Sequence, residues 1–315
     1  MPSEVVFQRI FLEQTFTSAN ILSKTKEYRP QETRGMSRKV DWLQILLQCK
    51  RAVQMQITPL LKKIDCQQPS LGVGAGGDPM KLMDLVAEKA IVNTIIKREI
   101  AFTLISEESG IKKFGETPED HFVTVDPIDG TTNLTRRIPF YATSIAVSTK
   151  PSLRTIHTAL VSDLFHNRTY TSQKGKGAQR DGKKITPTSE TSLEEAVMGL
   201  DVNSYKIRRL TPQLSRLIES TKHIRHFGAN ALELCYVADG TTDAFVDIRG
   251  KLRTTDMAAA WLILLEAGAT FTTPDGSPLN VRLHPTQKVA LVASANKKLH
   301  EIILGLINPK REPND

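Results

Sequence analysis

VDPIDGTTNL, at residues 125–134, is the stretch that decides how this chain is interpreted. Asp, Pro and Gly are ordinary turn formers, so a bend is expected here. A bend alone does not explain why Asp126 ends a β-like apolar run while Asp129 stands directly before Gly-Thr-Thr. If a helix begins at these small residues, its first backbone N–H groups attract an anion beside the two carboxylates. The stretch therefore predicts a site for a cation and a phosphate, with a plain turn as the alternative.

Two more acidic positions lie at the ends of expected elements. AFTLIS, residues 101–106, predicts a strand that ends at Glu107 and Glu108, and Asp256 stands before the apolar run in TTDMAAAWLILLEAGA. Taken singly, Asp256 has an ordinary explanation as a helix N-terminal charge, and Glu108 as a solvated neighbour of Glu107. Several carboxylates that converge without a cation repel one another, and carboxylates are the ligands that Mg²⁺ prefers. Together these positions favour a divalent-cation site beside a phosphate.

Composition narrows the class of protein. The chain has 315 residues, of which 40% are hydrophobic and 24% charged, as in one large globular domain or two that share a cleft. No apolar run is long enough for a membrane span, and the N-terminus lacks the apolar block of a secretory signal. Three scattered cysteines indicate neither a disulfide framework nor a Cys-based metal site. We therefore expect a cytoplasmic protein without membrane contact.

The net charge bears on the kind of partner the protein binds, and the histidine and serine patterns bear on whether it has a zinc site or a serine nucleophile. The formal net charge of +8 favours anionic partners. Aromatic residues make up only 6% of the chain and no basic region interleaves with them, which argues against nucleic acid. The seven histidines show no H-x-x-x-H pair, and no G-x-S-x-G segment occurs, so neither a zinc site nor a serine nucleophile is indicated.

Changes of pattern along the chain predict its organisation. Residues 1–35 are polar and unlike the rest, so we expect a weakly ordered N-terminal extension. Residues 36–190 are expected to form an α+β half that carries most metal ligands. Residues 191–308, where helices alternate with strands, are expected to form an α/β half that carries Asp256.

Periodicity and end signals place the main elements. Helical periodicity runs through residues 41–64, and a second helix is expected from Asp78-Pro79 to Lys97, with Asp84 and Glu88 one turn apart on its surface. HFVTV predicts a strand that ends at Asp126. Further strands are expected at residues 143–148, 158–162 and 168–171, in TTDAFVDI and in KVALVASA, with a hairpin region in KGKGAQRDGKKI and a helix that ends before Gly268.

The sequence resembles the magnesium-dependent, lithium-sensitive inositol monophosphatase and fructose-1,6-bisphosphatase superfamily. The matching segments, in the family's order, are SEES (106–109), DPIDGTTN (126–133), YTSQKGKGA (170–178) and TDMAAAWLILLEAGA (255–269). GDPMKLMDLVAE looks most like the archaeal-type branch, in which one enzyme often accepts both inositol monophosphates and fructose 1,6-bisphosphate. The resemblance covers about residues 40–305. It implies an α/β fold, the layered αβαβα sandwich of sugar phosphatases, with the metal site in a cleft between the two halves.

The resemblance also implies two to three Mg²⁺ ions in each active site. Glu107, Asp126 and the backbone carbonyl of Ile128 would bind the first ion. Asp126, Asp129 and Asp256 would bind the second, and Glu107 would help to hold a weaker third through water.

The remaining roles implied by the resemblance concern water, phosphate and sugar. Asp84 and Thr131 would orient and deprotonate the attacking water, and the amides of Gly130 and Thr131 would hold the phosphate. The expected substrate-side residues are Arg225, Gly228, Ala229 and Asn230, from RHFGANAL, and Asp247, from AFVDIR. Ala229 and Asn230 replace the family's commoner small or hydroxyl residues, so the identity of the substrate stays open.

These features predict a Mg²⁺-dependent phosphomonoesterase that acts on fructose 1,6-bisphosphate, inositol 1-phosphate or both, and that by resemblance forms a homodimer. A nucleotide such as 3′-phosphoadenosine phosphate is the alternative substrate, against which the low aromatic content argues mildly. An RNA-binding or regulatory protein on the same fold is the alternative from another class, against which the complete set of catalytic residues argues. Lys251 and Arg253 could reach a second phosphate, but a solvated basic loop is the favoured interpretation.

Overall fold

The computed structural model describes residues 40–61, 72–77, 81–203 and 207–308. Asp41–Asp315 form one compact unit, separate from Met1–Val40, and the fold described below belongs to this unit. The extension predicted at residues 1–35 lies outside the described residues, as do Asp78 and Pro79. No helix in the described part of the chain is long and apolar enough to span a membrane.

An eight-stranded sheet occupies the first part of the unit, in the order β2-β1-β3-β4-β5-β6-β7-β8. Its strands are β1 (Phe102–Ser106), β2 (Gly110–Phe114), β3 (Phe122–Asp129), β4 (Ala142–Ser148), β5 (Ile156–Asp163), β6 (Thr169–Gln173), β7 (Ala178–Arg180) and β8 (Lys183–Lys184). All neighbours pair antiparallel except β1 and β3, which are parallel. The carboxyl ends of β1 and β3 therefore meet at one edge of the sheet.

A five-stranded sheet follows, in the order β10-β9-β11-β13-β12. Its strands are β9 (Val197–Leu200), β10 (His223–Arg225), β11 (Ala244–Arg253), β12 (Thr270–Thr272) and β13 (Lys288–Ser294). β10, β9 and β11 pair in parallel, while β13 runs antiparallel to β11 and to β12. The strands predicted in TTDAFVDI and KVALVASA are confirmed as β11 and β13.

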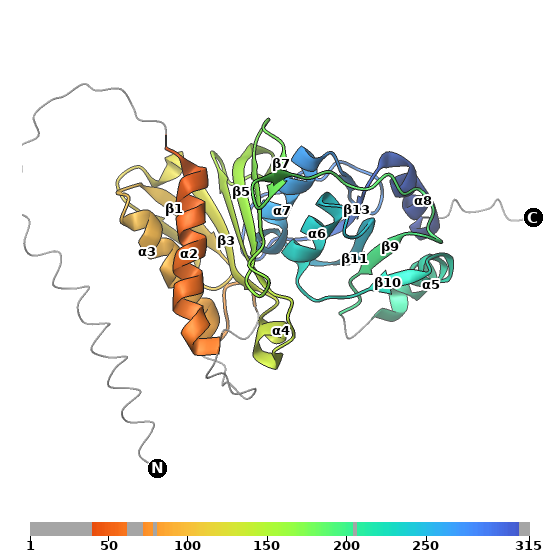
Figure 1. The fold of residues 1–315 in the computed structure, drawn as a ribbon, viewed down its shortest axis with the longest axis horizontal. Helices are drawn as coiled ribbons and strands as arrows, with labels where there is room; N and C mark the ends of the chain where they lie inside the picture. The colour runs from red at the N-terminus through yellow and green to blue at the C-terminus, as the bar shows by residue number, and fades with distance from the viewer. Residues whose placement is uncertain (1–39, 62–71, 78–80, 204–206, 309–315) are drawn as a thin grey trace, which may run out of the picture. The chain divides into compact units, whose positions relative to one another are not determined.

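Helices complete a layered arrangement, which Figure 1 shows from the side. Helices α2 (Trp42–Leu61) and α3 (Leu82–Ile96) cover one face of the first sheet, α6 (Asn230–Ala238) and α7 (Thr254–Ala267) lie between the sheets, and α5 (Thr211–Ser220) and α8 (Lys297–Ile307) cover the second sheet. Short helices are α4 (Thr131–Arg136) and the 3₁₀ turns η2 (Pro118–Asp120), η3 (Leu153–Thr155) and η4 (Ile207–Leu210). The predicted αβαβα sandwich is confirmed.

Helix α7 is the centre of the main hydrophobic core. Every residue from Thr254 to Leu264 is buried, including Trp261, and the core around this helix includes residues of both sheets. A helix that is apolar on all sides is stable only inside a protein. It ends as predicted at Gly268, whose φ of 91° suits a glycine C-cap. Glu266 near its end accepts hydrogen bonds from the amides of Gly175 and Gly177 at 2.7 and 2.8 Å, so the β6–β7 turn is attached to this helix.

Three sequence expectations are wrong in detail. α3 begins at Leu82, because Lys81 has an extended backbone (φ −112°, ψ 159°) that cannot continue a helix from Pro79. Asp84 and Glu88 are buried rather than on the helix surface, because α3 packs against both α2 and the first sheet. β3 does not stop at Asp126 but continues to Asp129, where it pairs again with β4 after a shift of register.

Candidate active site

Two parallel strands bring the first predicted metal ligands together. β1 ends at Ser106, so Glu107 follows it directly, and Asp126 lies on the neighbouring β3. The Glu107 N–H donates to the Val125 carbonyl at 3.2 Å and continues the pairing of the two strands. One carboxylate oxygen from each of Glu107, Asp126 and Asp256 lies within 4.8 Å of the others. Three carboxylate oxygens at this separation can hold a divalent cation.

A local irregularity lets two carboxylates of one strand serve the same site. The register of β3 with β4 shifts between Asp126 and Asp129, and the Thr143 hydroxyl donates to the Pro127 carbonyl at 2.8 Å. Such a bulge re-aims the side chains beside it. Both Asp126 and Asp129 are buried. The Asp-Pro-Ile-Asp spacing thus provides both a bend and two buried carboxylates on one strand.

Two of the carboxylates also stabilise helix N-termini, where backbone N–H groups lack partners within the helix. Asp129 accepts hydrogen bonds from the amides of Asn230 and Ala231, at 3.0 and 2.7 Å, at the start of α6. Asp256, in the first turn of α7, accepts one from the Arg253 amide at 3.3 Å. Both side chains are therefore held in position by the fold itself.

The negative charge of this carboxylate cluster, which comprises Glu107, Asp126, Asp129 and Asp256, is only partly balanced. Burial, reinforced by repulsion from neighbouring carboxylates, raises the pKa of Glu107, Asp126 and Asp129 well above the ordinary value. Arg253 places Nη1 3.0 Å from Glu107 Oε1 and 4.0 Å from Asp256 Oδ2. Arg253 is the one cationic side chain that the described ion pairs place beside these four carboxylates, and a single guanidinium does not neutralise four negative charges. The buried oxygen donors and their excess charge fit Mg²⁺, a hard cation that takes oxygen ligands.

The glycine-rich segment at residues 72–77 packs directly on this cluster. The Gly76 amide donates to the Glu107 carbonyl at 2.7 Å, and the Gly76 carbonyl accepts from Arg253 Nε at 3.1 Å. A Cβ atom at Gly76 would lie only 2.8 Å from Glu107 Cγ and from Arg253 Nε. Only glycine allows so close an approach of the backbone.

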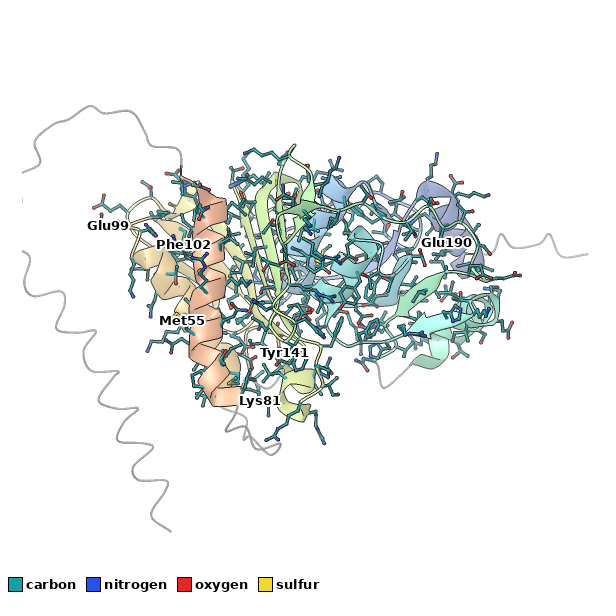
Figure 2. All side chains as sticks on the ribbon, viewed as in Figure 1. Met55, Lys81, Glu99, Phe102, Tyr141 and Glu190 are labelled. Carbon is teal, nitrogen blue, oxygen red and sulfur yellow. The ribbon has the colours of Figure 1, made fainter. Side chains whose placement is uncertain are left out.

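The predicted catalytic pair is in contact. Thr131 Oγ1 lies 3.0 Å from Asp84 Oδ1 and 2.9 Å from the Ile128 carbonyl. Asp84 Oδ2 accepts from the Lys81 amide at 2.9 Å, which holds the carboxylate at the start of α3. Figure 2 labels Lys81 at this end of the helix. Burial raises the pKa of Asp84 to about 6, a value useful for proton transfer near neutral pH.

Gly130 allows this pair to lie beside the loop that opens α6. Its φ of 87° is strained for any residue with a side chain. A Cβ at this position would also lie 3.1 Å from both the Ala229 Cβ and the Phe140 carbonyl. The glycine therefore permits both the turn into α4 and the close contact with the predicted substrate loop.

That loop, at residues 225–230, is held by two buried polar side chains. Asn133 Nδ2 donates to the carbonyls of Phe227 and Phe140 at 2.6 and 2.8 Å, which joins the loop to the end of α4. Glu233 Oε1 accepts from the amides of Phe227 and Gly228 at 3.2 and 2.9 Å. Burial raises the pKa of Glu233 to about 7. The backbone of the loop is thus fixed on both sides.

Asp247, the predicted contact to a substrate hydroxyl, belongs to a second charged group. Its Oδ1 accepts from Arg249 Nε at 2.9 Å and its Oδ2 from Arg249 Nη2 at 2.7 Å. Asp201 also pairs with Arg249 Nη2, and the Asn203 carbonyl accepts from Nη1 at 2.6 Å. Asp201, Asp247 and Arg249 are named here the arginine-bridged cluster. Their side chains are at most 6% exposed, so one buried guanidinium is shared by two buried carboxylates.

Comparison with known proteins gives the relationship. The family model described as "Inositol monophosphatase family" matches residues 43–312. The chain belongs to the inositol monophosphatase family. The resemblance expected from the motifs is therefore confirmed, and it extends over nearly all of the described residues.

Named relatives define the class of enzyme. A protein from Methanothermobacter thermautotrophicus, named fructose-1,6-bisphosphatase/inositol-1-monophosphatase, is 36% identical over 84% of this chain and 95% of its own length. A bifunctional NADP phosphatase/NAD kinase from Methanococcus maripaludis is 31% identical over 85% of this chain and 49% of its own length. A solved structure described as an inositol monophosphatase–fructose 1,6-bisphosphatase matches 85% of this chain and 100% of its own, with a TM-score of 0.74 and 28% identity. Within this family, the chain is a phosphoric monoester hydrolase of the archaeal dual-function branch.

The site residues predicted from the family resemblance fall into two groups, those that lie together and those that lie apart from them. The predicted metal ligands, the Asp84–Thr131 pair and Gly130 lie together around the ends of β1 and β3. Gly228, Ala229 and Asn230 adjoin them through Gly130 and Asp129. Arg225 is exposed and donates to the neighbouring Ile224 carbonyl at 2.9 Å, and Asp247 is bound by Arg249.

Sequence reasoning missed several residues of the site. The solvated basic loop favoured for Arg253 is wrong, because its side chain is 12% exposed and contacts the carboxylate cluster. The sequence did contain one signal for Arg253. It stands three residues before Asp256, the spacing at which a carboxylate in the first turn of a helix accepts from the backbone amide of the residue that precedes the helix. Asn133 and Asp201 carry no local signal, since their partners Phe227 and Arg249 lie 94 and 48 residues away. Arg249 does stand two residues after its partner Asp247 on β11, and Glu233 five residues after Gly228, so both had a short-range signal.

Proposed function

We propose that this family member is a Mg²⁺-dependent phosphatase of sugar and cyclitol phosphates, with fructose 1,6-bisphosphate and inositol 1-phosphate as substrates. The observation that carries the proposal is the hydrogen-bonded pair Asp84–Thr131 immediately beside the carboxylate cluster. A hydrolase of this kind needs both a group that activates water and a means of neutralising phosphoryl charge. The names of the archaeal relatives support the choice of substrates.

The cluster and the Ile128 carbonyl would hold Mg²⁺, which would supply charge stabilisation for the phosphoryl and leaving oxygens. The protein's own groups handle the proton. A threonine hydroxyl has a single hydrogen, so Thr131 can donate either to Asp84 or to the Ile128 carbonyl. If Ile128 is engaged by a cation, the hydrogen is directed to Asp84, and the Thr131 oxygen is left to accept from water. Asp84, with its pKa of about 6, is then ionised at neutral pH and ready to take up a proton.

The remaining groups position the substrate in this proposal. The amides of Gly130 and Thr131 hold the phosphate, and the loop that contains Gly228, Ala229 and Asn230 contacts the sugar. Its attachment through Asn133 and Glu233 keeps the sugar side aligned with the phosphate side. The number of bound ions, two to three, and assembly as a homodimer remain predictions.

The test is release of phosphate from fructose 1,6-bisphosphate and inositol 1-phosphate, measured side by side with Mg²⁺ and then with excess EDTA. We expect release from both substrates with Mg²⁺ and none with EDTA, and the ratio of kcat/KM values names the main substrate. Preparations of Asp256→Asn, purified in parallel, control for contaminating phosphatases. Release that is unaffected by EDTA would contradict the proposal.

Nucleotides are the second candidate substrates. Two relatives named bifunctional NADP phosphatase/NAD kinase are 31% and 33% identical to this chain, which spans 49% and 45% of their lengths. The same assay with NADP and with 3′-phosphoadenosine phosphate separates the candidates. A kcat/KM for either nucleotide that exceeds those for both sugar phosphates would reassign the enzyme.

A further inference from the structure

Glu88 is a buried acid that the proposed chemistry does not use. It lies on α3, one turn after Asp84, and is 7% exposed. A carboxylate in such a place is costly unless hydrogen bonds satisfy it. Its Oε2 accepts from the Ser106 hydroxyl and, at 3.2 Å, from the Ser109 amide. These partners stand on either side of Glu107 and Glu108.

The contacts continue through Ser106 into the turn itself. While its hydroxyl donates to Glu88, the Ser106 oxygen accepts from the Glu108 amide at 3.2 Å. The turn joins β1 to β2, whose pairing resumes between Ser106 and Gly110. The amides of residues 108 and 109 are thus both attached, directly or through one hydroxyl, to a single carboxylate of α3.

Glu107 is held between these attachments. Its own amide and carbonyl are bound by Val125 and Gly76, at 3.2 and 2.7 Å. Both backbone polar groups of Glu107 therefore have a partner, and the direction of its side chain follows from the backbone that carries it. Figure 2 labels Phe102 at the start of β1, the end of the strand remote from this turn.

We propose that Glu88 is a positioning residue, which holds the turn at residues 106–109 so that Glu107 points into the carboxylate cluster. The inference rests on the proposed function in that it takes the cluster to bind a divalent cation. Residues four apart on a helix share one face, about 6 Å apart along its axis. α3 therefore presents Asp84 to Thr131 and Glu88 to the Glu107 turn, and this one helix sets the spacing between the water-activating pair and a cation ligand.

A purely structural role for Glu88 is the competing explanation, and the chain contains a matched control. Asp243 is also 7% exposed, and its carboxylate also accepts from one hydroxyl, that of Thr188, and from one backbone amide, that of Val197 at 2.8 Å. It lies beside the second sheet and contacts no member of the carboxylate cluster among the described hydrogen bonds and ion pairs. Its removal should cost comparable stability for a reason unrelated to the cation.

The experiment compares Glu88→Ala, Ser106→Ala, Glu88→Gln and Asp243→Ala with the unmodified chain. Mn²⁺ binding is measured by calorimetry, with thermal unfolding measured on the same samples without metal. Loss of a partner that orients a metal ligand weakens binding about 10- to 100-fold, and we expect this for Glu88→Ala. Ser106→Ala, a small change that should fold, is expected to weaken binding less. Glu88→Gln keeps an acceptor oxygen and should restore most of the affinity, whereas Asp243→Ala should lower Tm only.

Mn²⁺ affinity equal to that of the unmodified chain in both Glu88→Ala and Ser106→Ala would overturn the positioning role. If Glu88→Ala does not fold, Ser106→Ala alone decides the question. Binding of Mn²⁺ by the unmodified chain without phosphate release from any substrate would overturn the proposed function but not this inference. Absence of Mn²⁺ binding by the unmodified chain would overturn both.

Discussion

The carboxylate cluster and the arginine-bridged cluster are both buried groups of acids beside one arginine, but they differ in how much of their negative charge that arginine compensates. In the first, repulsion and burial raise the pKa of Glu107, Asp126 and Asp129, and Arg253 offers only partial compensation. In the second, one guanidinium bridges Asp201 and Asp247 and uses its remaining nitrogen on the Asn203 carbonyl. One guanidinium thus lies beside four carboxylates in the first group but beside only two in the second, so the excess of negative charge is larger in the first.

The difference indicates which region is built for an outside cation. In a buried ion pair with good geometry each charge is stabilised by its partner, and removal of one partner is strongly destabilising. A group of carboxylates with raised pKa values gains stability when a cation arrives. The two regions therefore predict different responses to substitution, to Mg²⁺ and to pH.

The largest effect is expected from Asp256→Asn. The substitution removes one charged ligand from the cluster, so phosphate release should fall by about 10³-fold, as when an important electrostatic contact to a transition state is lost. The fold should remain, because repulsion within the metal-free cluster decreases. Turnover, Mn²⁺ calorimetry and circular dichroism measure these outcomes. Near-normal turnover would contradict the assignment of the cluster as the metal site.

Arg249→Met should have the next largest effect, this time on stability. It leaves Asp201 and Asp247 buried without their shared partner, which costs about 3–5 kcal/mol of unfolding free energy. Urea unfolding measures the loss, first without Mg²⁺ and then with Mg²⁺ at ten times its dissociation constant for the protein. Mg²⁺ should not restore it.

Arg253→Met is the matched comparison, because it removes a guanidinium from the other cluster. Its loss of stability should be largely recovered on addition of Mg²⁺, which can replace the missing positive charge beside Glu107. If Mg²⁺ rescues both arginine variants, or neither, the contrast between the two regions is not supported.

Acidification should stabilise the metal-free protein. Burial raises the pKa of Asp84 from 3.8 to about 6, so between these values the folded chain keeps a proton that the unfolded chain has lost. Stability from this group is therefore present at low pH and falls as pH rises through that window. We expect the free energy of unfolding in EDTA to be about 1–2 kcal/mol higher at pH 5 than at pH 7.5, relative to Asp84→Asn. Equal pH dependence in the two proteins would count against a raised pKa.

Asn133→Ala should produce the smallest effect and confine it to the substrate side. The substitution removes the hydrogen bond that joins the loop at residues 225–230 to α4, through the Phe227 carbonyl, and a second one to the Phe140 carbonyl. A net loss of about 1–1.5 kcal/mol corresponds to a KM about 5- to 10-fold higher. Mn²⁺ affinity should not change. A KM equal to that of the unmodified chain would mean that Asn133 serves the fold but not the substrate loop.

Most of the fold could be predicted because it depends on local patterns. The apolar run from Met257 to Leu264 can only be an interior helix, and Gly268 ends it. Short apolar segments followed by acids predicted β1 and β3 and placed Glu107 and Asp126 at their ends. The inward direction of α3 could not be predicted in this way, since Asp84 and Glu88 are ordinary surface residues unless Thr131 and Ser106 lie opposite them.

The sequence by itself determined which acids occur at element ends, and hence the family, the layered fold and the kind of ligand. These features are periodicities and spacings within about ten residues. Only the tertiary structure decided which charges are compensated. Asp129 reaches Ala231 across 102 residues, Arg249 reaches Asp201 across 48, and Arg253 reaches Gly76 across 177. The electrostatic energy of such pairs depends on separation in space and on burial, and both are set by the order of strands in the two sheets and by α7 between them.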